Sequence, residues 1–315
     1  MDISKVEYPL YKYYHPLPEI LDAFEDLKTY EFDYMESRKP NSIYMINVDF
    51  ERDKRLMRIT DYFTEDCRVK CNFADFISPF EYFRLNRESI IKSVGEEPTY
   101  KEIDDHLYKY GPRPCTTFST IVCTSVLRHF KPKRWLDPSA GWGDRLISAI
   151  NYGECEYRAT DPNECLHPKY KEIIETLADE QFIEDDRGKR PKYRITQEGF
   201  EDASIEANYY DLVFTSPPFF DLEKYSNAPT QSNVRFNQFE AWMNGFMYPL
   251  LIKSVAALKK NGHLCLYVND YRGMKYVADI QRYLKGNKRM KFLGCISWQQ
   301  GSAPRYIYVH QKIKK

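Results

Sequence analysis

The chain has 315 residues and a mass of 37.5 kDa, with 43% hydrophobic and 29% charged residues. This composition excludes bulk disorder and predicts one large globular domain, or a catalytic domain together with a smaller one. The formal net charge of zero excludes a uniformly basic protein that would adhere to any polyanion.

Targeting and metal-binding patterns are not found in the sequence. No stretch approaches the roughly 20 apolar residues that a membrane span needs, and the first residues lack the apolar core of a secretory signal. We therefore expect a soluble cytoplasmic protein whose eight cysteines are reduced. Neither the cysteines nor the six histidines have the spacing of a metal site, so we expect no metal.

Positive charge is concentrated in two clusters. Residues 281–315 contain nine basic residues and no Asp or Glu, so the other 280 residues carry a formal charge of minus nine. A second basic cluster lies between Arg187 and Arg194. Such local patches suit a polyanionic substrate, although a solvated surface is the alternative for each cluster. The residues that we expect to contact the substrate are Lys288, Arg289 and Lys291 in the first cluster and Lys189 and Arg190 in the second.

Residues 1–112 carry no recognisable motif. Strand-like residues occur at 42–48, and helical patterns occur at 20–30 and 80–94. We predict that this part is an accessory or recognition region of mixed helix and strand.

Residues 113–315 alternate between helical patterns and short apolar runs. We expect helices over 118–130, 144–151, 167–179 and 239–259, strands over 134–137, 156–160, 193–196, 210–215 and 263–268, and a hairpin from 291–298 and 305–310. The last helix is expected to stop at Asn261-Gly262. This alternation predicts an α/β fold, with a doubly wound, mostly parallel, seven-stranded Rossmann-like sheet, an antiparallel C-terminal hairpin at its edge, and an N-terminal α+β extension.

The first candidate site is the turn Asp137-Pro-Ser-Ala-Gly-Trp-Gly143, which follows an expected strand. Gly141 and Gly143 would let the backbone approach a ligand without a side chain in the way. The pattern is not G-x-G-x-x-G, because a third glycine is missing. Asp137 at the strand end would repel a pyrophosphate and attract an ammonium group, such as that of S-adenosylmethionine (SAM).

The second candidate is Asp161, which ends the next expected strand, 18 residues after Gly143. An acidic residue at about this spacing accepts hydrogen bonds from a ribose diol. The alternative is a surface turn, since Asp-Pro often begins one.

The third candidate is Ser216-Pro217-Pro218-Phe219, which follows the apolar strand 210–215. The two prolines fix the backbone and remove two N–H donors, so that carbonyl acceptors remain. Ser216 and the Pro217 carbonyl would accept the two N–H bonds of an amino group on a heteroaromatic ring, and Phe219 would stack on that ring. A rigid turn is the alternative.

The three motifs, in this order, resemble those of a class I SAM-dependent amino-methyltransferase. Enzymes of that family methylate adenine N6 or cytosine N4 and carry the motif [Asn/Asp/Ser]-Pro-Pro-[Tyr/Phe/Trp]. The resemblance covers roughly residues 113–315, so we predict a methyltransferase domain there. Serine in the first position resembles the cytosine enzymes, whereas the order of the motifs resembles an arrangement that many adenine enzymes share. The chain departs from the family at Ser139-Ala140, where Phe or Leu often precedes the Gly-x-Gly, and in lacking an evident recognition domain after the catalytic motif.

The resemblance also implies residue roles. Ser216, Pro217, Pro218 and Phe219 would be catalytic, and Phe220 or Tyr225 would complete the stack on the base. The residues that would bind SAM are Asp137, Pro138, Ala140, Gly141 and Gly143 at its methionine end, Thr117 and Phe118 at its carboxylate, Asp161 at its ribose, and Glu201 and Asp202 at its adenine.

These features predict a SAM-dependent methyltransferase that acts on an exocyclic amino group of a nucleic-acid base, with DNA favoured over RNA. Methylation of RNA is the first alternative. A non-catalytic SAM-fold subunit that binds nucleic acid within a heteromer is the second.

Overall fold

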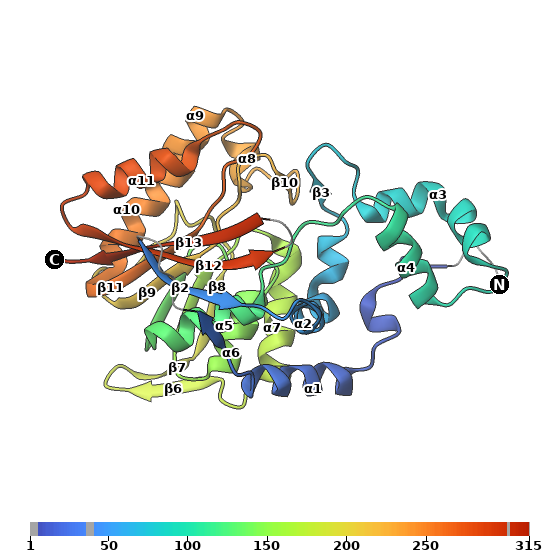
Figure 1. The fold of residues 1–315 in the computed structure, drawn as a ribbon, viewed down its shortest axis with the longest axis horizontal. Helices are drawn as coiled ribbons and strands as arrows, with labels where there is room; N and C mark the ends of the chain where they lie inside the picture. The colour runs from blue at the N-terminus through green and yellow to red at the C-terminus, as the bar shows by residue number, and fades with distance from the viewer. Residues whose placement is uncertain (1–5, 36–40, 301–302, 315) are drawn as a thin grey trace.

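The computed structural model describes residues 6–35, 41–300 and 303–314. Within them, a nine-stranded sheet runs in the order β1-β2-β12-β13-β11-β9-β4-β5-β8 (Figure 1). In that order the strands are Asp33–Met35, Ser42–Asn47, Met290–Gln300, Ala303–Lys312, Leu258–Tyr267, Tyr210–Thr215, Arg134–Asp137, Glu156–Thr160 and Tyr193–Thr196.

The α/β fold with a mostly parallel sheet is confirmed. The strands β11, β9, β4, β5 and β8 are parallel to one another, and β12 and β13 form an antiparallel hairpin. The hairpin is not at the edge of the sheet, which differs from the expected position. Strand β2 of the N-terminal part pairs in parallel with β12, with Ile46 opposite Trp298, and β1 pairs with β2. The seven expected strands are therefore extended to nine by β1 and β2.

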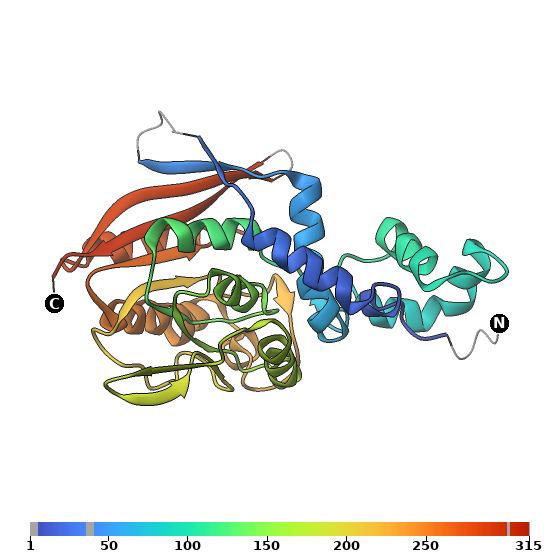
Figure 2. The ribbon, with the colours of Figure 1, turned by 90° about the horizontal axis from the view of Figure 1, so that it is seen from below.

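Helices cover both faces of the sheet (Figure 2). The described helices are α1 Leu17–Lys28, α2 Phe50–Arg68, α3 Pro79–Val94, α4 Tyr100–Tyr110, α5 Thr120–Phe130, α6 Asp144–Tyr152, α7 His167–Leu177, α8 Ser232–Arg235, α9 Phe239–Trp242, α10 Tyr248–Ala257 and α11 Tyr276–Gly286. Alternate strand residues face opposite cores, because side chains alternate along a strand. Trp135 and Phe214 belong to the core with α1, α2 and α5–α7, whereas Leu136 and Val213 belong to the core with α9–α11.

The N-terminal part is divided between two cores. Helices α1 and α2 pack into the main core, but α3 and α4 project to one side of the molecule (Figures 1 and 2). There they form a small core of their own, which includes Phe83, Ile91 and Leu107. Thr99 begins α4 with a capping box, in which its hydroxyl and the Glu102 side chain satisfy each other's backbone N–H groups. The division of the chain at residue 112 stays a prediction.

The long helix expected over 239–259 is shorter in the structure. The π-helical turn Met243–Met247 joins α9 to α10, and the helix ends at Ala257. Strand β11 begins directly at Leu258 and contains an irregularity before His263. Asn261 lies in this irregular segment with φ of 69°, so Asn261-Gly262 is part of a bulged strand and not a helix stop.

The structure joins Cys67 of α2 to Cys165 by a disulfide, with the two Cα atoms 6.0 Å apart. This differs from the expectation that every cysteine is reduced, while the other six cysteines are free thiols. In the described part of the chain, no helix combines the length and apolar character that crossing a membrane requires.

Candidate active site

A cavity of about 410 Å³ opens at the carboxyl ends of the parallel strands. Its walls include the segments that follow β4, β5, β8, β9 and β11, the segment that leads into α5, and residues of the β12–β13 hairpin. The chain proceeds from β4 outward to β5 and β8, and then returns to β9 on the other side of β4. The cavity therefore lies where the strand order reverses, which is where ligands bind in open α/β sheets.

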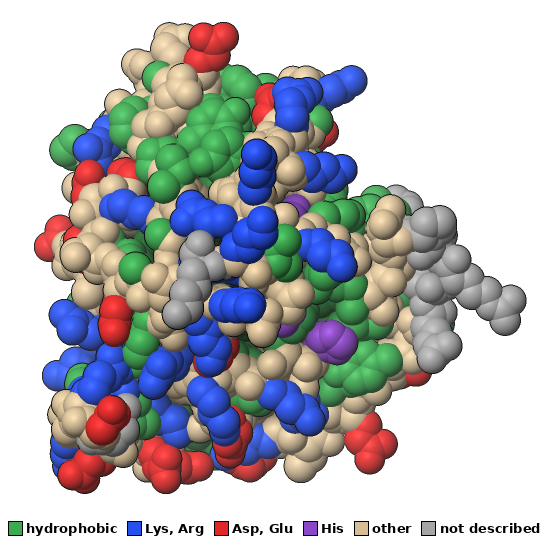
Figure 3. All heavy atoms as spheres, turned by 90° about the vertical axis from the view of Figure 1, so that its left-hand side faces the viewer, with side chains coloured by type: hydrophobic (Ala, Val, Ile, Leu, Met, Phe, Trp, Pro, Cys, Tyr) green, Lys and Arg blue, Asp and Glu red, His purple; other side chains and the backbone are tan. Residues whose placement is uncertain are grey.

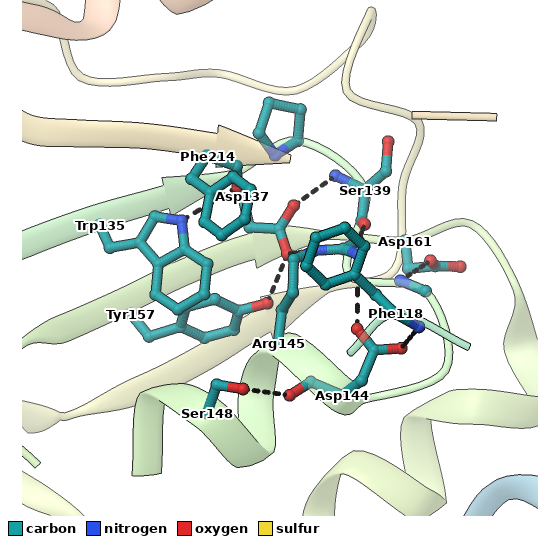
Figure 4. A network of polar contacts seen from close by, with 12 residues as sticks. Phe118, Trp135, Asp137, Ser139, Asp144, Arg145, Ser148, Tyr157, Asp161 and Phe214 are labelled. Atoms are coloured by element: carbon teal, nitrogen blue, oxygen red, sulfur yellow. Dashed lines mark hydrogen bonds and ion pairs between the residues drawn. The ribbon is translucent and has the colours of Figure 1, made fainter. Parts of the chain in front are cut away.

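Asp137 is fully buried, and Figure 4 shows its polar contacts. Its Oδ2 atom accepts hydrogen bonds from Arg145 Nε at 2.8 Å and from the Tyr157 hydroxyl at 2.8 Å, and its Oδ1 atom accepts one from the Ser139 amide at 3.2 Å. Asp137 is therefore not among the lining residues. It holds the turn that follows β4 in place, and the direct contact to an ammonium group that the motif suggests stays a prediction.

The two glycines of this turn have different surroundings. Gly141, with φ of 63°, lines the cavity together with Pro138. Gly143 has φ of 95°, and a Cβ atom there would come within 2.9 Å of Ile173 in α7. Gly143 thus makes room for helix packing, while Ala140 is buried and donates its amide hydrogen bond to Thr160.

Asp161 lies at the cavity end of β5. Its carboxylate accepts hydrogen bonds from the backbone amides of Gly141 and Asn163, both at 2.9 Å. Burial raises the pKa of this carboxyl group to about 6, against the two backbone hydrogen bonds that lower it. The amide of Gly141 ties the two expected SAM motifs directly to each other.

Of the two adjacent acidic residues expected at the adenine of SAM, one lines the cavity and the other does not. Glu201 lines it, and burial raises the pKa of its carboxyl group. Its Oε1 atom lies 3.4 Å from Arg235, but its buried Oε2 atom has no hydrogen-bond partner among the residues that the structure describes. Asp202 is exposed, pairs with Arg235 and does not line the cavity.

The segment before α5 covers one side of the cavity. Thr117 and Phe118 line it, and the Phe118 amide donates to the buried Asp144 carboxylate at 3.2 Å. Burial raises the pKa of Asp144 to about 6. The preceding residue, Thr116, donates its amide and its hydroxyl to Glu223, at 2.7 and 3.0 Å, which fastens the segment across the cavity.

The Ser-Pro-Pro-Phe turn follows β9, and all four of its residues line the cavity. The Phe219 ring lies 5.9 Å from the Tyr267 ring. Phe220, with φ of 53°, instead packs against Phe239 and Trp242 in the core that includes α9–α11. Its side chain does not line the cavity. Tyr225 lines the cavity and donates its hydroxyl hydrogen bond to Glu223 at 2.7 Å.

Several lining residues were not singled out in the sequence. Glu223 is buried and is shared by Thr116 and Tyr225, and burial raises its pKa. The end of β11 contributes Tyr267 and Asn269, and the C-terminal hairpin contributes Trp298 and Arg305. Asn269 directly follows the expected apolar strand 263–268, and this position could have marked it as a candidate site residue. No local signal marks the hairpin residues, because pairing across the sheet brings them to the cavity.

The five basic residues expected at the substrate lie at the other end of the sheet. Lys291 is the second residue of β12, whose start lies beside the amino ends of the parallel strands. Arg190 contacts Glu156 at the start of β5 and the hydroxyl of Tyr209, directly before β9. Figure 3 views this side of the molecule, on which many Lys and Arg side chains gather. We refer to Lys189, Arg190, Lys288, Arg289 and Lys291 as the basic end; none of them lines the cavity.

Comparisons with known proteins give low similarity. No protein-family model matches the sequence, and no relative is found among curated proteins. A putative class I SAM-dependent methyltransferase from Listeria monocytogenes is 16% identical, over 99% of this chain and 83% of that one, with a TM-score of 0.46. TrmN from Thermus thermophilus is 15% identical, over 70% of each chain, with a TM-score of 0.45.

Proposed function

We propose that the protein is a SAM-dependent methyltransferase whose acceptor is the exocyclic amino group of a nucleic-acid base, cytosine N4 or adenine N6. One observation carries the proposal: the Ser216–Phe219 turn lines the same cavity as Asp161 and Glu201. DNA is the favoured polymer because the motifs resemble those of DNA amino-methyltransferases.

The residues present fit SAM. The free Oε2 atom of Glu201 is a buried acceptor that suits a ligand hydroxyl or amino donor, and Asp161 provides a second carboxylate. Gly141 offers backbone without a side chain, and Thr117 and Phe118 line the same cavity. When bound, SAM supplies an electrophilic methyl group on a sulfonium. The chain holds this cofactor through the carboxylates of Asp161 and Glu201.

The Ser-Pro-Pro-Phe turn positions the base that receives the methyl group. Pro217 and Pro218 have no N–H groups, so the turn presents acceptors and not donors to the cavity. The Ser216 oxygen and the Pro217 carbonyl accept the two N–H bonds of the base amino group, which directs its nitrogen lone pair. Phe219 stacks on the ring of a base that has left its helical stack. Most of the rate enhancement would come from this positioning.

Transfer of a labelled methyl group tests the proposal. The protein is incubated with methyl-tritiated SAM and with DNA or RNA of mixed sequence, and the digested nucleosides are analysed by mass spectrometry. We expect the methyl group on an exocyclic nitrogen, and the label in DNA or in RNA identifies the polymer. A methyl group on a ring carbon, a ribose oxygen or protein would contradict the role of the Ser-Pro-Pro-Phe turn.

The role of Asp161 predicts a pH-dependent affinity for SAM. With its pKa raised to about 6, the carboxyl group is neutral at lower pH and becomes a charged acceptor as the pH rises. SAM affinity should therefore increase between about pH 5 and pH 7. Asp161→Asn should bind SAM about tenfold to a hundredfold more weakly at pH 7 and lose most of this increase, because the charged acceptor is gone. Calorimetry at several pH values measures both effects, and an equal pH dependence in the variant would remove Asp161 from the site.

We propose that the basic end binds phosphates of the polymer at a distance from the target base. Replacing Lys288, Arg289 and Lys291 with Ala should reduce the slope of log affinity against log salt by about 0.9 for each duplex phosphate that these residues neutralise. SAM affinity should not change, because the basic end lies away from the cavity. Fluorescence anisotropy with a labelled duplex measures the slope. Replacing the exposed Lys92, Lys101 and Lys109 of the N-terminal part is the control, and an equal slope in both triple variants would leave the basic end as a solvated surface.

A further inference from the structure

One side of the cavity has no role in the function proposed above. Tyr267 and Asn269 reach it from the end of β11, Trp298 reaches it from β12, and Arg305 reaches it from β13. Trp298 and Arg305 are directly opposite each other in the hairpin. These four residues line the same cavity as the Ser-Pro-Pro-Phe turn, and none of them belongs to a motif that resembles a SAM-binding segment.

Aromatic rings form a continuous wall on this side. The Tyr267 ring lies 5.2 Å from Phe118, 5.3 Å from Trp298 and 5.9 Å from Phe219, between ring centroids, and Phe118 lies 6.0 Å from Trp298. Such rings suit the faces of a planar heterocycle, since every nucleic-acid base can stack on an aromatic side chain. Phe219 of the Ser-Pro-Pro-Phe turn belongs to this wall, so the wall is continuous with that turn.

Arg305 is a cationic residue beside this wall, directly opposite Trp298 in the hairpin. Its Nε atom is buried and has no hydrogen-bond partner within the described ranges 6–35, 41–300 and 303–314. No ion pair joins Arg305 to an acidic side chain in those ranges either. The hydroxyl of Tyr267 is close enough for the Arg305 charge to lower its pKa, although burial is the larger effect and raises that pKa.

The acidic and polar neighbours are already engaged. The Asn269 side chain hydrogen-bonds with the Tyr267 hydroxyl. Asp270 also lines the cavity, but it is exposed and its Oδ1 atom accepts the Val277 amide at the start of α11, at 3.0 Å. A buried donor without a partner costs free energy, so Arg305 is suited to an acceptor that a ligand brings.

We infer that Tyr267, Trp298 and Arg305 form the subsite for the target nucleotide, in which Arg305 donates hydrogen bonds to one of its oxygen atoms. This inference rests on the function proposed above and extends it to the part of the acceptor away from its amino group. The guanidinium has donors only, so its partner is an acceptor. Two sources fit: the ring carbonyl of cytosine, which adenine lacks, or the phosphate of the target nucleotide.

Binding of mononucleotides tests the subsite without requiring turnover. Titrations of cytidine, cytidine 5′-monophosphate and adenosine 5′-monophosphate are made by calorimetry, with the demethylated product of SAM present at saturation. Arg305→Met replaces the arginine with an unbranched apolar side chain and removes the hydrogen-bond donors. It should weaken the preferred nucleotide about tenfold to a hundredfold, the effect of losing a charge-assisted hydrogen bond.

The three ligands distinguish the two sources of the oxygen. If Arg305 contacts the ring carbonyl, Arg305→Met weakens both cytidine ligands and leaves the adenosine ligand unchanged. If it contacts the phosphate, both monophosphates weaken equally and cytidine does not change. Arg305→Lys keeps the charge and should recover part of the affinity. Arg84→Met is the control, because Arg84 is an exposed residue of α3 that pairs with Glu81.

The inference would be overturned if, for each of the three ligands, both Arg305 variants bound with the same affinity as the wild type. So would a loss of affinity for the demethylated cofactor as large as that for the nucleotide, since Arg305 would then belong to the cofactor half of the cavity. Failure of the proposed function gives a different result, in which the wild type transfers no methyl group to DNA or RNA. If mononucleotide binding still depends on Arg305 in that case, the nucleotide subsite is supported even though the proposed methyl transfer is not.

Discussion

Ser216→Ala should reduce methyl transfer about 100-fold while SAM binding stays nearly unchanged. The change removes one acceptor of the base amino group, and losses of about 10²–10³ in turnover are typical when one positioned hydrogen-bonding group is removed from a reacting centre. Both prolines remain, so the turn after β9 keeps its backbone. The Asp161 and Glu201 carboxylates lie on other segments of the cavity and are untouched. Single-turnover transfer to an oligonucleotide measures the rate, and calorimetry measures SAM affinity.

Phe219→Ala tests the same turn through stacking. The loss of the ring should reduce the affinity for the target base by about 1–3 kcal/mol. Phe220→Leu is the matched control, because Phe220 is the next residue but packs against Phe239 and Trp242 and not into the cavity. Transfer that is equally impaired in the Phe219 and Phe220 variants would point to a general disturbance of the turn. Unaltered transfer in both Ser216→Ala and Phe219→Ala would remove this turn from the reacting centre.

Arg145→Ala should destabilise the folded protein by about 3–5 kcal/mol. Arg145 pairs with the fully buried Asp137 at 2.8 Å, and removing one partner leaves a buried charge without compensation. The Tyr157 hydroxyl and the Ser139 amide still donate to Asp137, but neither carries a positive charge. The turn that follows β4 depends on this network (Figure 4). Urea unfolding, followed by far-ultraviolet circular dichroism, measures the free energy of unfolding.

Two further variants separate the buried charge from the loss of side-chain volume. Arg282→Ala removes an exposed arginine that pairs with Asp279, and such surface pairs contribute at most about 1 kcal/mol. The double variant Asp137→Asn with Arg145→Met removes both charges, so it should be more stable than Arg145→Ala alone. If Arg145→Ala and Arg282→Ala have the same stability, the Asp137 network does not hold the turn.

Strand alternation and the local motifs could be predicted from the sequence because their causes are local. The strands β4, β5, β8 and β9 occupy the residues expected for them, since short apolar runs bounded by turns have few other ways to bury their side chains. The same reasoning placed Asp161 and the Ser-Pro-Pro-Phe turn at carboxyl ends of parallel strands, and the cavity lies there. It failed at Leu258–Gly262, where an apolar run that could continue a helix is instead the start of β11.

Only the tertiary structure decided which distant residues meet. Asp137 meets Arg145 and Tyr157, and the direction of β12 places the basic end at the end of the sheet opposite the cavity. Likewise, β2 joins the sheet beside β12, and the hairpin brings Arg305 to the cavity. A side chain's local sequence sets the strand on which it lies. Its partners depend on the order and direction of strands that are far apart in the chain, and local periodicity carries no information about either.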